Sequence, residues 1–545
     1  MKLNYKRTIF VGFAFFLICA FWQAYDNTIP LILTNKFGLS QTASGAVMAL
    51  DNVLALFLLP LFGAISDRCH SKLGKRTPFI LIGTIAAAVI FVGLSFADGA
   101  QLKNISAVSQ IDDPAAMQVI YTQESETDLQ TPDGTAYRLS ALFSEEEFCR
   151  IPSQLVVTDG TIAQTDGTLY ALADRFTEAE RADIDKHDDG KAFTNPHYTD
   201  YVVPARQAYA WNQTAENPTA LIVFIALLLM VLLSMATFRS PAVALMPDVT
   251  IKPLRSKANA VINLMGSAGG ILILGLGMVF ATGSVKNSMM SFTPYYIVIA
   301  LVMLTALALF LWQVREPKLV KQMQEESRRY GIEEETQEEN GGKLGKGERR
   351  SMCFLLASIV LWFMGYNAVT SKYSVYASSV LNKDYNLTLI IAQAAAIISY
   401  LPIGMVSSKL GRKKTILTGI VMLTTSFTVA CFLRESSPTI LMNAMFALAG
   451  IGWATINVNS FPMVVEMCKG GSVGKYTGIY YTASMAAQTV TPLLSGYLMD
   501  KLGLTALFPY AAVFVALAFV TMLFVMHGDN KPTAKRGLEA LDVED

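Results

Sequence analysis

The chain of 545 residues is poor in charge, in histidine and in paired cysteines. Asp, Glu, Lys and Arg together make up 16% of it, whereas an ordinary soluble domain carries about 25%. The six cysteines form no Cys-x-x-Cys pair, and the four histidines are too dispersed to suggest a metal centre. The 43 basic residues are balanced by 43 acidic ones, so no excess of basic charge points to nucleic acid. These absences argue against a soluble enzyme, a disordered chain and a nucleic-acid-binding protein, and no cofactor or metal is expected.

Apolar residues, by contrast, make up 52% of the chain and gather in long runs. A transmembrane helix needs about 20 mostly apolar residues, and twelve stretches of this sequence meet that requirement. The predicted spans are residues 8–33, 42–66, 77–97, 218–238, 257–282, 293–313, 352–378, 386–408, 414–433, 438–461, 476–499 and 505–526. The sequence therefore predicts an all-α membrane protein of twelve transmembrane helices in two six-helix pseudo-repeats.

Basic residues concentrate in alternate loops, which predicts the orientation. If the N-terminus is cytoplasmic, the inside segments other than 314–350 hold 20 Lys and Arg residues and the short outside loops hold five. Such an excess is typical of cytoplasmic loops. We therefore expect a multi-pass plasma-membrane protein with both termini in the cytoplasm and a retained first helix, surrounded by lipid and working as a monomer.

Two polar segments interrupt the apolar pattern. Residues 99–217 carry 20 acidic and 8 basic residues, with Asp-Gly turns between β-rich runs such as QLVV and TLYAL and a short helix over 177–187. This segment is predicted to be a small α+β domain outside the membrane. The predicted parts are 1–98 (helices 1–3), 99–217 (extracytoplasmic insert), 218–313 (helices 4–6), 314–350 (charged cytoplasmic linker), 351–527 (helices 7–12) and 528–545 (cytoplasmic tail).

A loop motif recurs at matching places in the two halves, as LGKRTPFILIG (73–83) and LGRKKTILTG (410–419). Repeated halves are typical of secondary transporters, which hold their substrate between them. The first copy lies within SDRCHSKLGKRTPF (66–79), which resembles the loop between helices 2 and 3 of the major facilitator superfamily. The residues of this motif are most similar to those of the glycoside–pentoside–hexuronide:cation symporters and the sucrose transporters. SPAVALMPDV (240–249) and residues 474–492 resemble helices 4 and 11 of those proteins.

The resemblance covers about 400 residues, excludes 99–217, and implies transport by alternating access. It also implies that Asp67 helps to hold the cytoplasmic side closed, by pairing with Arg68 or Arg76 or by facing a helix N-terminus. The alternative is that Asp67 only caps a solvated loop. The predicted gating residues are Gly63, Asp67, Arg68, Gly74, Lys75, Arg76, Arg239, Asp248, Gly411 and Arg412.

Three ionisable residues fall inside predicted spans: Asp26, Asp51 and Lys372. Each costs about 2.5–3.5 kcal/mol to insert, so each is a functional candidate by default. One carboxylate could be the site of a coupling proton. The alternatives are a fixed Asp–Lys pair that joins the halves, or helix ends that place these residues in outside water.

The family comparison bears on the coupling ion. Asp51 aligns with the first Asp of the sodium-site pair in melibiose permease, but Ala55 stands where the second Asp is expected, which favours protons over sodium. Leu232 and Val243 stand where plant sucrose transporters carry an Asp and an Arg. Arg239, one helical turn before Val243, is a candidate substitute or, alternatively, a loop charge.

A sugar presents hydroxyl groups around its ring and apolar C–H faces, so its site needs amides, carboxylates and flat aromatic rings. These types gather in the predicted helices 1, 7, 10 and 11, although each can also serve in packing or at the membrane interface. The candidate residues for substrate and cation are Trp22, Gln23, Tyr25, Asp26, Asn27, Asp51, Asn52, Asn263, Tyr366, Asn367, Lys372, Asn457, Asn459, Tyr480 and Gln488.

The sequence as a whole predicts a secondary active transporter that moves a sugar or glycoside, in symport with protons. No nucleotide-binding motif appears, so ATP is not expected to drive it directly. Two alternatives stay open: a carrier of another small solute, and a membrane sensor whose external domain binds a ligand.

Overall fold

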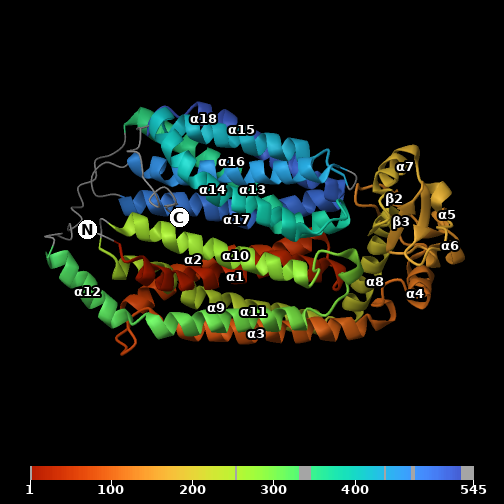
Figure 1. The fold of residues 1–545 in the computed structure, drawn as a ribbon, viewed down its shortest axis with the longest axis horizontal. Helices are drawn as coiled ribbons and strands as arrows, with labels where there is room; N and C mark the ends of the chain where they lie inside the picture. Colours follow the sequence, from red (N-terminus) through yellow and green to blue (C-terminus); the bar gives the residue numbers. More distant parts are fainter. Residues whose placement is uncertain (1–2, 252–253, 330–344, 435–436, 468–472, 529–545) are drawn as a thin grey trace.

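The computed structural model describes residues 3–251, 254–329, 345–434, 437–467 and 473–528, and its long helices run side by side (Figure 1). The first half contains α1 (Tyr5–Asn35), α2 (Gln41–Asp67), α3 (Thr77–Asn104), α9 (Thr219–Val249), α10 (Arg255–Val279) and α11 (Thr293–Gln313). The second half contains α13 (Lys346–Ser379), α14 (Tyr385–Leu410), α15 (Arg412–Ala430), α16 (Thr439–Glu466), α17 (Val473–Leu502) and α18 (Leu507–Leu523).

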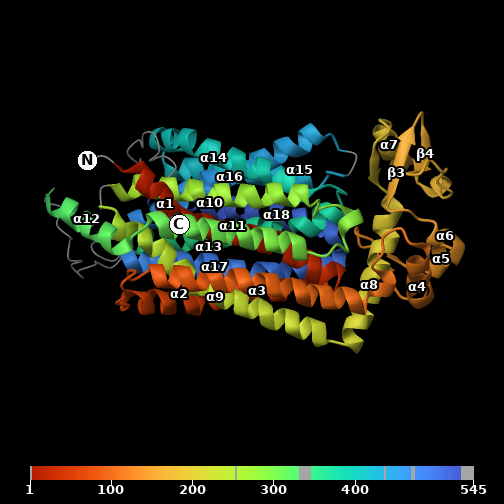
Figure 2. The same ribbon diagram turned by 60° about the horizontal axis from the view of Figure 1, so that its bottom comes forward.

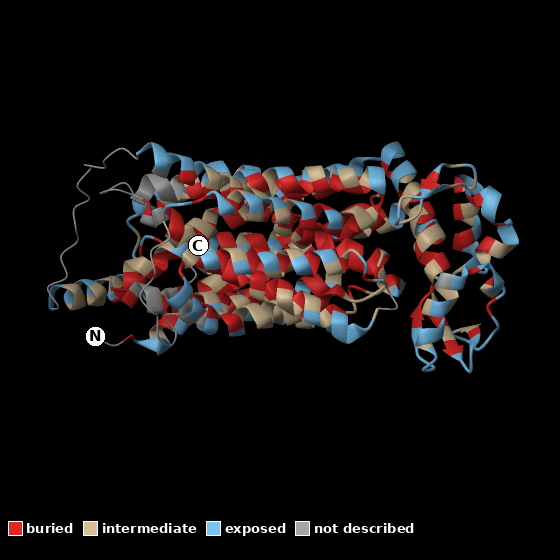
Figure 3. Cartoon of the chain, turned by 90° about the horizontal axis from the view of Figure 1, so that it is seen from above, coloured by how far each residue is buried: buried red, intermediate tan, exposed pale blue. Residues whose placement is uncertain are grey.

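The helices are long and apolar, as the sequence predicts. Among the described residues, nine are long and apolar enough by composition to cross a membrane, and α14, α15 and α17 do not meet that measure. Large apolar side chains such as Phe57, Phe96 and Ile222 are more than half exposed, which suits contact with lipid. Buried residues lie inside the bundle (Figure 3). The all-α membrane fold is thus confirmed, with twelve long helices among the described residues.

Each half has its own apolar core. In the first half Phe91 stacks on Tyr296 with ring centroids 4.1 Å apart, inside a cluster drawn from α1, α3, α9, α10 and α11. In the second half Trp362 and Phe508 are almost fully buried in a separate cluster. Two separately packed units can move relative to one another without either core being opened.

The insert lies at one end of the bundle, and α12 (Glu316–Arg329) projects at the other (Figures 1 and 2). We call these the insert end and the α12 end. The insert contains α4 (Pro114–Glu124), β1 (Leu129–Gln130), β2 (Ala136–Tyr137), α5 (Leu139–Leu142), α6 (Glu145–Cys149), β3 (Gln154–Thr158), β4 (Thr161–Gln164), α7 (Glu178–Ile184), β5 (Ala192–Thr194) and α8 (Val203–Glu216).

The insert has an α+β fold, as predicted. Its antiparallel sheet has the order β4-β3-β5, and the β3–β4 hairpin turns at Asp159-Gly160, where both residues have positive φ. Two details of the prediction are wrong. TLYAL (168–172) forms a single bridge at Leu169 instead of a strand, and the helix expected over 177–187 ends as an α-helix at Ile184 and continues as one 3₁₀ turn.

The insert contacts both halves of the bundle. Toward the first half, Gln207 Nε2 donates to Asn35 Oδ1 at 2.9 Å. Toward the second half, Thr199 Oγ1 donates to Asn382 Oδ1 at 2.8 Å. A tight turn-to-turn contact supports the second attachment: a Cβ added at Gly503 (φ +87°) would lie 2.4 Å from the backbone of Asp133. The insert therefore bridges the two halves at this end.

A buried ion pair also stands near the insert end of the first half. Lys36 Nζ lies 2.6 Å from Asp98 Oδ1, and both side chains are fully buried. Lys36 also donates to the carbonyl of Met290 at 2.7 Å. These contacts join the turn after α1, α3 and the segment before α11.

Candidate functional site

A polar cavity lies between the two halves, midway along the helices. It consists of two neighbouring pockets of ≈470 and ≈180 Å³ that share Trp22, Asp26 and Arg239. The first half also contributes Gln23, Tyr25, Asp51, Asn52, Asn259, Asn263 and Ser267. The second half contributes Asn367, Thr370, Ser371, Gln393, Tyr400, Asn457 and Gln488. The cavity is therefore a site to which both halves contribute.

The charged part of the cavity belongs to the first half. Asp26 and Trp22 lie one turn apart on the same face of α1, because residues four apart are neighbours on a helix. The Arg239 guanidinium of α9 lies 5.5 Å from the centre of the Trp22 ring, in the range of a cation–π contact. Asp51 of α2 lines the smaller pocket beside Asp26 and Arg239, and Arg239 interacts electrostatically with both carboxylates.

The position of Arg239 decides whether it is a cavity charge or a loop charge, which the sequence left open. It stands inside α9, which continues through Pro241 and Pro247 to Val249, so it faces the cavity and is not a loop charge. Helices can continue past proline in membrane proteins where neighbouring groups satisfy the freed backbone. Arg239 was predicted as a gating residue, and the structure places it beside the candidate substrate and cation residues.

The second half supplies neutral polar groups. Gln393 Nε2 of α14 donates to Gln23 Oε1 of α1 at 2.5 Å across the cavity. Neither Gln393 nor Tyr400 was predicted from the sequence. α14 carries two amides, Asn386 and Gln393, and two phenols, Tyr385 and Tyr400. Which of them faces the cavity depends on how the helix packs.

Several predicted site residues lie outside the two pockets. Asn27 is buried behind them, and the Tyr366 ring stacks on Trp453 at 3.7 Å. Asn459 accepts a hydrogen bond from Ser407, and Tyr480 is hydrogen-bonded to Ser460 at 3.2 Å. These four residues lie among the packed helices and do not line either pocket.

Lys372 is also outside the cavity, and it does not pair with either Asp26 or Asp51 in this structure. Its side chain is fully buried. Nζ donates to the backbone carbonyl of Gln41 at 2.8 Å and approaches the Gln41 side-chain oxygen at 3.3 Å. Lys372 thus joins α13 to the N-terminus of α2, and the fixed pair with Asp26 or Asp51 that the sequence offered as an alternative is not formed.

The cavity is closed at the insert end by α2 and α17. Asp500 of α17 accepts hydrogen bonds from the backbone N–H groups of Gln41 at 2.6 Å and Thr42 at 2.7 Å. A carboxylate is favoured there because the first N–H groups of a helix lack partners and carry partial positive charge. A Cβ at Gly45 would lie 2.0 Å from the Pro492 carbonyl, so the two backbones touch. We call the contact of Lys372 and Asp500 with residues 41–42 the α2–α17 gate. Sequence reasoning missed Asp500.

At the α12 end, the predicted gating motif forms a network of charges. Arg76 donates through Nε to Asp248 Oδ2 at 2.9 Å and through Nη2 to Asp67 Oδ1 at 2.5 Å. Of the two partners proposed for Asp67, the structure gives Arg76, and Arg68 is exposed. The network ties together the ends of α2, α3 and α9 within the first half. Gly63 belongs to the same packing, because a Cβ there would lie 2.9 Å from Ser240 Oγ.

A carboxylate caps the N-terminus of α3, and the sequence did not reveal it. Glu316, the first residue of α12, accepts the backbone N–H groups of Lys75 at 2.7 Å and Thr77 at 2.8 Å. Gly74 has φ +116° and lies so close to Glu316 that a Cβ would be 2.3 Å from its carboxyl carbon. The charged segment after α11 is therefore fixed to the motif loop at its first turn.

The matching loop of the second half is built on Gly411, with φ +91°. Arg412 begins α15 there. Lys413 Nζ donates to the carbonyls of Leu523 at 2.9 Å and Val525 at 2.6 Å, where α18 ends. A cation at a helix C-terminus is favourable because the last carbonyls lack partners.

Comparisons with known proteins agree with this architecture. Residues 10–102 match the family described as "MFS/sugar transport protein", and residues 383–542 match the "Major Facilitator Superfamily". The chain is 40% identical over 68 residues to the sucrose transport protein SUC3 of Arabidopsis thaliana, and 34% identical over 92 residues to the human proton-associated sugar transporter A. These alignments cover 12% and 17% of this chain, and 11% and 12% of the relatives.

A fungal MFS-type transporter, ppzB of Metarhizium rileyi, is 25% identical over 141 residues, which are 26% of this chain and 28% of the relative. The chain thus covers less than a third of each of these relatives. Among solved structures, the xylose transporter XylE of E. coli superposes with a TM-score of 0.54 at 13% identity, and covers 99% of both chains. A bacterial homologue of ferroportin gives 0.53 at 12%, and covers 96% of this chain and 99% of its own.

Two six-helix halves around a shared polar cavity define the fold of a membrane transporter. Each half also contains a match to a family model, "MFS/sugar transport protein" in the first and "Major Facilitator Superfamily" in the second, and the fold is similar to that of XylE.

Proposed function

We propose that the protein is a secondary transporter that moves a sugar or glycoside, in symport with protons, by alternating access. The observation that carries the proposal is the polar cavity between two separately packed halves, closed at the insert end by the α2–α17 gate. With the insert outside the cell and both termini in the cytoplasm, this arrangement is the state closed to the outside. Each chain holds a complete cavity, which fits a monomer in the plasma membrane.

The lining suits a sugar. Amides from both halves can bind hydroxyl groups, and the Trp22 ring can pack against the apolar face of a sugar ring. A volume of ≈470 Å³ lies within the range of about 300–1,000 Å³ for small-molecule sites. The names of the relatives support the same class of substrate.

Charge balance supports coupling to protons. Asp26, Asp51 and Arg239 sum to −1 when both carboxylates are ionised. One proton makes the set neutral, and moving neutral groups through a closed, dry intermediate costs less than moving a net charge. Binding one proton and one sugar would therefore favour the change between the two open states. Ala55 leaves a sodium site of the melibiose permease type incomplete.

The test is uptake of labelled monosaccharides and disaccharides into proteoliposomes under an imposed pH gradient, with and without sodium. We expect uptake driven by the pH gradient that Asp51→Asn abolishes while sugar exchange across the membrane continues. Asp174→Asn is the matched control, because its carboxylate is fully exposed on the insert. No uptake of any sugar by folded protein would exclude the sugar assignment. Uptake that follows sodium alone would exclude protons as the coupling ion.

A further inference from the structure

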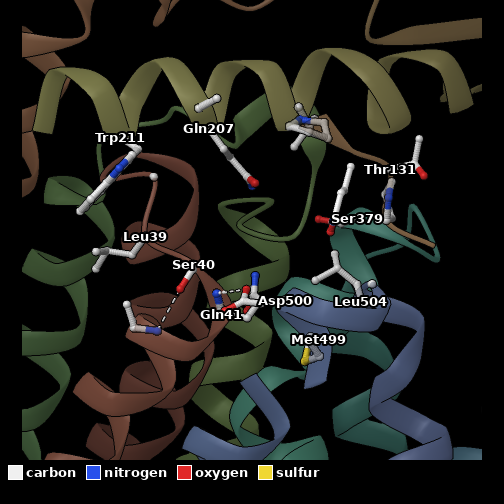
Figure 4. Close-up of a pocket in the computed structure, with 18 of the residues that line it drawn as sticks. Leu39, Ser40, Gln41, Thr131, Gln207, Trp211, Ser379, Met499, Asp500 and Leu504 are labelled. Atoms are coloured by element: carbon white, nitrogen blue, oxygen red, sulfur yellow. Dashed lines mark hydrogen bonds between the residues drawn. The ribbon is translucent and has the colours of Figure 1, made fainter. Parts of the chain in front are cut away.

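A second cavity lies at the insert end, directly beyond the α2–α17 gate. Its volume is ≈570 Å³, larger than either central pocket. Figure 4 shows α8 crossing above this space, with Gln41 and Asp500 below it. Because the same two residues form the gate, this cavity stands on the route that a solute would take to the central one.

Three parts of the molecule build its walls. The first half provides the α1–α2 turn and Gln41, the second half provides Ser379 and Asp500, and the insert provides Gln130, Gln207 and Trp211. The amide, hydroxyl and carboxylate groups surround one space with an aromatic ring at its edge. The cavity therefore exists because the insert bridges the two halves.

The chemistry of the insert wall is that of a carbohydrate site. Gln207 and Trp211 are four residues apart on α8 and share one face, and Figure 4 shows Gln207 pointing into the cavity. Trp211 is 45% exposed although it lines the cavity. An open indole face beside amides can stack on the C–H face of a sugar while the amides bind its hydroxyl groups.

This wall is held in position before any ligand binds. A Cβ at Gly38 (φ +67°) would lie 2.3 Å from both the Gln207 carbonyl and the Trp211 N–H, so α8 rests directly on the α1–α2 turn. The Gln207 amide is oriented by its hydrogen bond to Asn35 at 2.9 Å. A preorganised site loses less entropy on binding.

We infer that this cavity is a second binding site, which holds a free mono- or disaccharide on the insert side of the closed gate. The class of ligand rests on the proposed function, whereas the existence of the site rests on the cavity and its walls. A sugar held here is next to the gate when the gate opens. The site therefore raises the rate of entry at low sugar concentration and leaves the maximal rate unchanged.

The experiment separates this site from the central one by measuring binding to the full chain in detergent. The probes are tritiated xylose, maltose and sucrose. Arg239→Gln disables the central cavity, and Trp211→Ala or Trp211→Tyr alters the second cavity. Trp312→Ala is the control, because Trp312 is 70% exposed on α11, away from both cavities.

We expect the Arg239→Gln protein to retain binding of one probe. Adding Trp211→Ala should weaken that binding about tenfold, the effect of losing about 1.4 kcal/mol, and Trp211→Tyr should restore most of it. In otherwise unaltered protein, Trp211→Ala should raise the KM for uptake from the insert side severalfold, with an unchanged maximal rate and an unchanged KM from the α12 side.

If Arg239→Gln abolishes sugar binding and Trp211→Ala does not change it, the second site does not exist. The transport proposal would remain intact. If the folded parent binds and moves none of the probes, the sugar assignment fails and the saccharide site fails with it.

Discussion

The two halves share a fold and a repeated loop but use charge differently. In the first half, charged side chains bind one another: Lys36 pairs with Asp98, and Arg76 pairs with Asp67 and Asp248. In the second half, three charged side chains among the described residues bind backbone groups. Lys372 and Lys413 donate to carbonyls, and Asp500 accepts from N–H groups.

Under the proposed alternating access, contacts within one half, including those of Lys413, would persist, whereas the contacts of Lys372 and Asp500 with α2 join the two halves and would break. Both partners of each charge pair in the first half belong to the same half, so a movement of one half relative to the other would not separate them. The α2–α17 gate joins different units, and a backbone N–H or carbonyl left behind can be satisfied by water when the gate opens. A buried charge without a partner would cost much more. The first half also has charged contacts with backbone groups, since Glu316 binds the N-terminus of α3 and Lys36 donates to the Met290 carbonyl.

The largest effect is expected at the buried pair. Asp98→Asn leaves the Lys36 ammonium buried without its carboxylate, and breaking such pairs costs about 3–5 kcal/mol. Thermal unfolding of the purified protein should therefore occur at a much lower temperature. The control is Asp128→Asn, whose salt bridge to Arg138 is exposed on the insert and should contribute under about 1 kcal/mol. Equal shifts for the two variants would contradict the assignment of a permanent contact.

The gate gives the second prediction. Asp500→Ala removes the acceptor of two backbone N–H groups, and hydrogen bonds to charged groups contribute about 1.5–3 kcal/mol. The insert end should open more often, by about tenfold or more. Reaction of a cysteine placed at Ser44, which is buried, with a maleimide added from the insert side measures this opening.

Lys501→Ala is the matched control for the gate, since Lys501 is adjacent and exposed. A labelling rate equal to that of the parent would show that Asp500 does not hold the gate.

The two repeat loops can be compared directly. Glu316→Gln removes the charge that caps α3, and Lys413→Met removes the cation at the end of α18. Capping interactions of this kind contribute about 0.5–2 kcal/mol. We expect Glu316→Gln to destabilise the protein more, because Glu316 serves several N–H groups. A larger decrease in unfolding temperature for Lys413→Met than for Glu316→Gln would contradict this expectation.

The smallest effect concerns the insert, which stands outside the membrane segments. Burial, with Glu180 and Asp133 nearby, raises the pKa of Asp200 to about 7. The folded insert then holds this proton more tightly than the unfolded chain does, so stability falls as pH rises from about 4 to 7. Asp200→Asn should remove this dependence of stability on pH. At pH 8 it should raise the free energy of unfolding by about 1–2 kcal/mol, and the unfolding temperature should rise with it. If the unfolding temperature of the variant equals that of the parent at every pH, Asp200 is not the titrating group.

Local patterns predicted the fold well. The first predicted span, 8–33, corresponds to α1 (Tyr5–Asn35), because the length of an apolar run is set by the thickness of the bilayer. The Asp-Gly pair at 159–160 predicted its hairpin, because the turn needs positive φ. The fourth span was predicted too short, because its prolines look like a helix end and the helix continues through them to Val249.

The site was predicted only in part, because periodicity shows what a helix carries and not what it faces. Trp22, Asp26, Asp51 and Gln488 lie in the cavity as the hypothesis required. Lys372 does not, since the approach of α2 to α13 decides its partner. The repeated motif likewise marked matching loops in both halves, whereas the partners of the basic residues come from distant segments.

The turn-to-turn contact of Gly503 with the insert has a practical consequence. Both Gly503 and Gly134 have positive φ, and each lies within 3 Å of the other's backbone once a Cβ is added. A valine at either position would act as a wedge and push the insert away from α17. Under the proposed alternating access, such a substitution would favour opening at the insert end, so that the opposite conformation could be imaged without a ligand or an antibody fragment.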